Sequence, residues 1–195
     1  MLMCSRRGVA RTAVAAVTAL ATSVVLWSAP ASAAERRFRD AADDAPARVD
    51  IRAVRVEHGA RALRLVVHVD RLRRNRGGGT DSVVVYVDHM TRRRGPEFYA
   101  QVEGFHAAFG RMRRWRPTRS SDDAGARRCR GFRARYRTRA DRVVFVLPRS
   151  RDCLGRIRRA RVSATVAHPR DPSWSDFVVD HAPARREFYR WVRVG

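Results

Sequence analysis

A period of two in the hydrophobic pattern recurs along most of the chain and constrains the fold more than any other feature. The segment 63–69 illustrates it, because leucine or valine occupies every second position. Successive side chains of a β-strand point to opposite faces, whereas a helix would need a period near 3.6 residues. No segment has a convincing helical period. The sequence therefore predicts an all-β fold.

The alternating segments are short and follow one another at intervals of roughly 8–12 residues, which is typical of a β-sandwich. We predict an antiparallel sandwich of about nine short strands. The first of them changes phase near Ala53-Val54, which indicates a β-bulge. The expected strands cover 49–58, 63–69, 83–87, 98–102, 107–115, 132–136, 143–147, 162–166 and 177–180.

Val83–Val87 is apolar on both faces except at Tyr86, so we expect a central strand that is covered on both sides. Phe98–Val102 is its expected antiparallel partner, because the separation is short and Gly95-Pro96 prevents a continued helix. The three arginines at 92–94 would then lie at the exposed tip of the hairpin.

Residues 1–34 have the organisation of a secretory signal peptide. A basic region with three arginines precedes an apolar stretch over 12–27, and small residues follow at 29–34. The apolar run of about 16 residues is shorter than the ~20 residues of a membrane span. We expect secretion by the general route, with the twin-arginine route as the alternative. Residues 35–46 are an expected flexible lead-in, and 47–195 form a single domain.

The chain carries 42 Lys+Arg, all of them arginine, against 19 Asp+Glu. Removal of the leader takes away three arginines and no acid, which lowers the formal net charge from +23 to +20. A complete lack of lysine is typical of a high-GC genome. Part of the charge can therefore reflect codon usage rather than selection for a partner.

One predicted strand nevertheless places arginines and core residues on opposite faces. In 132–139 the even positions as far as Tyr136 face the core and the odd positions are arginine. Such rows bind phosphate or carboxylate groups well. We expect binding to anionic polymers or surfaces at the cell envelope, without specific recognition of nucleic acid. The candidate polyanion-binding residues are Arg133, Arg135, Arg137, Arg139, Arg113 and Arg114.

Two cysteines, Cys129 and Cys153, remain after the leader. In a secreted domain two cysteines are more often bridged than free, so we predict a disulfide. A metal pair is the less favoured alternative, because no CxxC motif and no neighbouring histidine accompany them.

Asp88-His89 ends the predicted central strand, where an aspartate can accept hydrogen bonds from N–H groups of the following turn. The alternative is a calcium site at Asp88 and Glu97, or one built from the acids near the start of the domain, because calcium prefers oxygen ligands. Those acids are Asp40, Asp43, Asp44 and Asp50. Asp180-His181 presents the same choice. We otherwise expect no cofactor and no metal.

Several stretches of the chain resemble known proteins. They are DAADDAPARVDIRAVRVEHGARALRLVVHV, VVVYVDHMTRRRGPEFYA, RDCLGRIRRARVSATVA and DHAPARREFYRWV. Together they resemble a set of uncharacterised secreted proteins of high-GC bacteria. The first two are also similar to carbohydrate-binding-module and DOMON-type β-sandwiches, which implies a jelly-roll or DOMON-like arrangement. His181 stands where these relatives carry a tryptophan, so a stacking platform for a sugar is missing.

We expect a non-catalytic secreted protein. The six histidines are not spaced as a zinc motif, and no G-x-S-x-G nucleophile elbow is present. The alternative is a secreted carboxylate-dependent hydrolase acting on envelope or extracellular polysaccharide. Paired carboxylates keep that alternative open, since their distance is set in space rather than in sequence.

Overall fold

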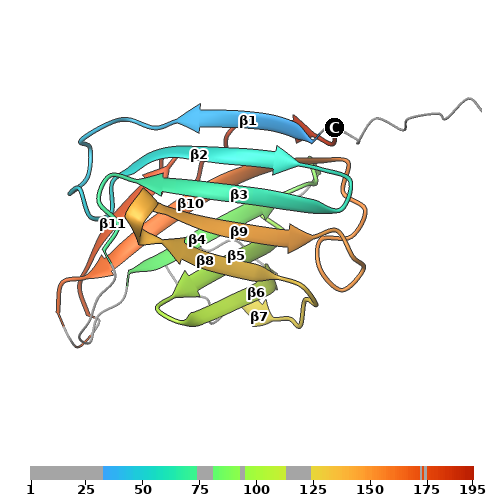
Figure 1. Ribbon diagram of the computed structural model, residues 1–195. Coiled ribbons are helices and arrows are strands. Elements are labelled where there is room, and N and C mark those ends of the chain that lie inside the picture. Colours follow the sequence, from blue (N-terminus) through green and yellow to red (C-terminus); the bar gives the residue numbers. More distant parts are fainter. Residues whose placement is uncertain (1–32, 74–80, 93–94, 113–123, 172, 174) are drawn as a thin grey trace, which may run out of the picture.

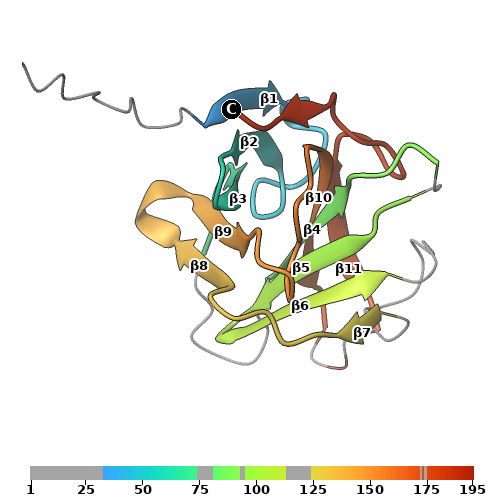
Figure 2. The same cartoon turned by 90° about the vertical axis from the view of Figure 1, so that its right-hand side faces the viewer.

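The computed structural model describes residues 33–73, 81–92, 95–112, 124–171, 173 and 175–195. These residues form twelve β-strands and one 3-10 turn, Thr138–Ala140, without an α-helix. Two antiparallel sheets pack together (Figure 1, Figure 2). The predicted antiparallel β-sandwich is confirmed, with three short strands beyond the nine expected.

The first sheet has five strands. Their order is β1 (Ala34–Arg39), β2 (Ile51–His58), β3 (Ala62–Val69), β9 (Arg142–Pro148) and β8 (Arg133–Arg137). The second sheet has seven strands. Six follow the order β11 (Phe177–Ala182), β10 (Arg159–Pro169), β4 (Ser82–Asp88), β5 (Phe98–Glu103), β6 (His106–Met112) and β7 (Ala124–Ala126), and β12 (Val192–Arg193) pairs with one end of β10. β1 and β8 are therefore the edges of the first sheet.

The predicted hairpin is formed by β4 and β5, with Val85 opposite Ala100. β4 also pairs with β10, so it is central in its sheet as expected. The expected cover on both faces is wrong, because Val84 and Tyr86 on the outer face are only partly buried. Gly95 has φ of 97°, a backbone conformation that residues with a side chain rarely adopt. Arg92 is exposed in the connection, whereas 93–94 lie outside the described residues.

The core lies between the two sheets and follows the period of two. In β3, β4 and β9 the inward positions are completely buried and the residues between them are mostly half-exposed. Burial of one large aliphatic or aromatic side chain contributes roughly 1.5–3 kcal/mol, so this interior is the main source of stability. The largest fully buried side chains are Phe145, Ile51, Leu63, Leu65 and Leu147. The expected bulge is also present, as a register shift between Ile51 and Ala53.

The expectation of a flexible lead-in over 35–46 is wrong for its first part, which belongs to strand β1. The pairing of β1 with β2 runs from Ala34 opposite His58 to Arg39 opposite Ala53. Phe38 packs against the core, and its ring stacks on Tyr189 at 4.5 Å. The strand was missed because Phe38 is the only large apolar residue in a charged segment.

The two ends of the described chain meet at His58. Ala34 lies opposite His58 at the start of β1, and the N–H of Gly195 donates to the carbonyl oxygen of His58 at 3.1 Å. Figure 1 shows the C-terminus beside the beginning of β1. The expected signal peptide lies almost entirely outside the described residues. None of the helical structure in the described part is long and apolar enough to cross a membrane.

Candidate functional site

The arginines of β8 lie as the alternation predicted. Arg133, Arg135 and Arg137 are exposed, while Ala134 and Tyr136 pack against the core. Arg139 is exposed in the 3-10 turn that follows. The structure therefore brings four of the six candidate residues together along one edge of the first sheet. The other two, Arg113 and Arg114, lie outside the described residues.

Tyr136 connects this edge strand to the opposite sheet. Its hydroxyl group hydrogen-bonds the carbonyl oxygen of Asp81 and lies 3.1 Å from that of Val102. Burial, and then the negative charges of Asp81 and Glu103, raise the pKa of Tyr136, so the hydroxyl remains protonated. The arginine row thus projects from a strand that is fixed on its inner face.

The β8 groove is the open hollow of about 570 Å³ beside these arginines, over β8, β9 and the neighbouring β3. Val144 and Val146 of β9 lie opposite Arg135 and Arg133, and Val146 lies opposite Arg64 of β3 on its other side. Among the described residues, the lining includes six arginines, two valines and no acid. The groove therefore has an apolar floor between basic walls.

The arginines of the first sheet differ in whether they form ion pairs with acidic side chains. Arg64 is paired with Glu57 at 2.5 Å, Glu57 with Arg55 at 2.9 Å, and Arg55 with Glu35 at 2.7 Å. This network compensates the arginines of β2 and β3. By contrast, none of the arginines that β8 and its following turn contribute to the groove is ion-paired with an acid in the described part of the chain. Uncompensated positive charge thus lies along the β8 edge, as it also does on the exposed Arg36, Arg37 and Arg39 of β1 at the opposite edge.

Asp88 has the role predicted from its place at a strand end. Its Oδ1 accepts the N–H of Met90 at 3.0 Å, and its side chain is 0% exposed. The sequence did not reveal its ion pair with Arg161, whose Nε and Nη2 lie 2.7 and 2.6 Å from Oδ2. The Arg161 guanidinium also lies over the Trp191 ring, 4.9 Å from its centroid. Because Arg161 already binds Oδ2, this arrangement argues against a calcium site at Asp88.

Glu97, the other residue of the calcium site considered from the sequence, is buried beside Asp88. Its Oε2 accepts the N–H of His89 at 2.8 Å, whereas Oε1 is buried and accepts no hydrogen bond. Burial raises the pKa of Glu97, and the neighbouring Asp88 carboxylate raises it further. We interpret the pair as a structural contact, in which the Glu97 carboxyl group stays protonated to a higher pH than that of a solvent-exposed glutamate.

We expect the Glu97→Gln variant to lose less stability with rising pH than the wild type. A raised folded-state pKa means that the stability contributed by neutral Glu97 is complete below its ordinary pKa of 4.5 and is lost as pH rises through the folded value. Glutamine remains neutral throughout. Urea unfolding between pH 4.5 and 8 measures the difference, with the exposed Glu187→Gln as control. Parallel curves for the wild type and Glu97→Gln would contradict the assignment.

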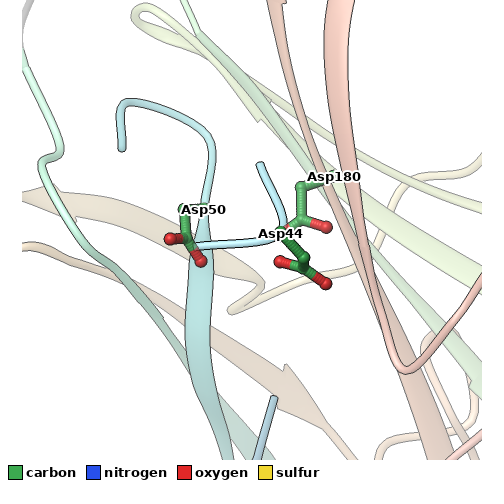
Figure 3. A group of neighbouring side chains, drawn as sticks. All are labelled: Asp44, Asp50 and Asp180. Carbon is green, nitrogen blue, oxygen red and sulfur yellow. The ribbon is translucent and has the colours of Figure 1, made fainter. Parts of the chain in front are cut away.

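A group of acids lies at the opposite end of the first sheet from the chain termini. Carboxylate oxygens of Asp44, Asp50 and Asp180 lie within 4.8 Å of one another. Figure 3 shows Asp50 at the beginning of β2, with the Asp44 segment between it and Asp180 of β11. Burial, and then the charges of Asp180 and Asp44, raise the pKa of nearby Asp40 to about 6. The sequence identified the acids at 40, 44 and 50 but did not predict that Asp180 joins them.

The predicted disulfide is confirmed between Cys129 and Cys153, with a Cα–Cα distance of 4.8 Å. It links the segment before β8 to the turn after β9. The covalent bond therefore closes the open end of the β8–β9 hairpin, the element that carries the groove.

Comparison with known proteins gave no match to a family model, to a curated protein or to a solved structure. The resemblance to secreted proteins of high-GC bacteria stays an expectation. Fold and geometry define the class of the protein, an antiparallel β-sandwich with a basic groove along one edge.

Proposed function

We propose that the protein is secreted and binds linear anionic polymers at or outside the cell envelope, through the β8 groove. Binding is electrostatic and has little sequence or sugar specificity. The observation that carries the proposal is the uncompensated charge of the β8 arginines beside the fully paired arginines of β2 and β3.

The geometry of β8 supports the same conclusion. Residues two apart on a strand are separated by about 6.6–7 Å, which is close to the phosphate repeat of an extended polymer. Arg133, Arg135 and Arg137 can therefore contact successive anionic groups. The apolar floor of Val144 and Val146 accommodates the uncharged part of the repeating unit, such as a sugar or glycerol.

A labelled single-stranded oligonucleotide provides a simple phosphodiester probe. Four phosphate contacts predict a slope of about −3 in a plot of log affinity against log salt. We expect the change of Arg133, Arg135, Arg137 and Arg139 to serine to reduce this slope towards zero and to weaken binding at 50 mM salt at least tenfold. Fluorescence anisotropy across a salt series measures both quantities.

The control variant must remove the same number of positive charges from positions outside the β8 groove. Arg61, Arg71, Arg156 and Arg193 are exposed and form no ion pair in the described part of the chain, so their change to serine preserves the fold. Arg48 is unsuitable because it contacts the buried Asp81 at 3.0 Å. Equal losses in the two quadruple variants would refute the groove and leave only net charge. Parallel titrations with alginate and with anionic vesicles distinguish the phosphodiester from other anionic groups.

The alternative of a carboxylate-dependent hydrolase has less support. No acid of the described part of the chain lines the β8 groove. Asp88 and Glu97, which neighbour each other, are buried, at 0% and 5% exposure. A polysaccharide substrate could not reach that pair in this conformation. The composition of the groove favours binding over hydrolysis there.

A further inference from the structure

The acids near the start of the domain converge because of the topology of the two sheets. Asp40 follows β1, and Asp44 and Asp50 precede β2, so these three lie in the connection between two strands of the first sheet. Asp180 belongs to β11 of the second sheet. Its Oδ2 accepts the N–H of Ile51 at 2.7 Å, and this contact joins the two sheets at the acidic end.

Negative charge exceeds positive charge at this place, in a protein that is otherwise strongly basic. Arg52 is the nearby cation, and its Nη2 lies 2.8 Å from Asp43, 3.1 Å from Asp70 and 3.3 Å from Oδ2 of Asp50. No ion pair reaches Asp40, Asp44 or Asp180 within the described residues. Of the three carboxylates that face one another, Asp50 shares the charge of Arg52, whereas Asp44 and Asp180 lack a compensating charge.

A second observation is independent of the count of acids. The side chain of Asp50 is 0% exposed, yet its Oδ1 has no hydrogen-bond partner. Oδ2 of the neighbouring Asp40 is also buried, and the Tyr189 hydroxyl interacts with this carboxyl group. Buried carboxylate oxygens are normally satisfied, since each unsatisfied polar atom costs about 1–3 kcal/mol. The unpartnered Oδ1 of the fully buried Asp50, within an acidic cluster, points to a cation as its partner.

We propose that Asp44, Asp50 and Asp180 bind a calcium-class divalent cation, with Asp40 beside them. The ligands are all oxygen and come from both a loop and a strand, which suits the flexible coordination of Ca²⁺ better than zinc or copper. Each oxygen of Asp180 accepts one backbone N–H, and a carboxylate oxygen has a further lone pair for a metal. The cation would fasten the two sheets together at this end.

Terbium(III) tests the site directly, because it replaces calcium and is excited through nearby aromatic rings. Tyr189 is the candidate ring, because it stacks at 4.5 Å on Phe38, which is two residues before Asp40. We expect the chelator-treated mature protein to show saturable terbium luminescence that calcium displaces. We also expect millimolar calcium, the range of extracellular calcium modules, to raise the melting temperature.

Asp44 is the best residue to change because it is exposed and its loss leaves the core intact. The Asp44→Asn variant should bind calcium at least tenfold more weakly. Asp176→Asn removes an equal charge from an exposed acid and should bind like the wild type. The absence of saturable binding up to 10 mM calcium, or equal affinities of the two variants, would overturn the proposal. The quadruple serine variant of the β8 groove should retain calcium binding, which separates this site from the proposed function.

Discussion

Replacing Val85 with aspartate is expected to prevent the domain from folding. Val85 is 0% exposed and lies in β4, between β5 and β10 in the second sheet. A buried carboxylate without a partner costs several kcal/mol, and the total stability of a domain is only about 5–15 kcal/mol. Far-ultraviolet circular dichroism and thermal unfolding of the purified variant measure the result.

The neighbouring position provides a matched control. Val84 lies on the same strand but is half-exposed on the outer face of the sheet. The Val84→Asp variant should therefore fold, with a much smaller loss of stability. Similar melting temperatures for the two variants would show that the inner face has been wrongly assigned.

Loss of the disulfide should produce the second largest effect. Cys129 and Cys153 are 24 residues apart in sequence, and closure of a loop of this length contributes roughly 3 kcal/mol through the unfolded state. For a chain of this size the double alanine variant should melt about 6–12 °C lower. Differential scanning calorimetry of this variant, and of the wild type with and without reductant, measures the change.

The bridge also matters for the groove. It closes the end of the β8–β9 hairpin, so its loss should increase local opening of β8 before global unfolding. Hydrogen exchange at the amides of Ala134 and Tyr136 reports this opening. An unchanged melting temperature after reduction would mean that the contacts of the folded hairpin suffice without the covalent bond.

Local patterns in the sequence were sufficient to predict the strands that bury one face. Leu63, Leu65 and Val67 alternate with more polar residues because one side of β3 faces the core, and the row on β8 was visible for the same reason. β1 lacks this signal, since Phe38 is its only large apolar residue. A strand whose pairing depends mainly on backbone hydrogen bonds leaves little trace in composition.

The candidate sites also differ in whether their residues are close in sequence or are brought together only by the tertiary fold. The arginine row occupies one strand, so its spacing could be predicted from the period alone. The acidic cluster joins Asp50 to Asp180, which are 130 positions apart by their residue numbers and meet only because β2 and β11 lie in facing sheets. The same reason explains why Arg161 was not expected beside Asp88.

The meeting of Ala34 and Gly195 at His58 determines how the domain responds to mechanical force. A load applied between the two ends would act first on the pairing of Ala34 with His58 and on the hydrogen bond from Gly195. The backbone hydrogen bonds between β1 and β2 would then break one after another from this end, rather than all at once in shear. The protein would yield first at this corner, while the bridge between Cys129 and Cys153 limits how far the chain can extend.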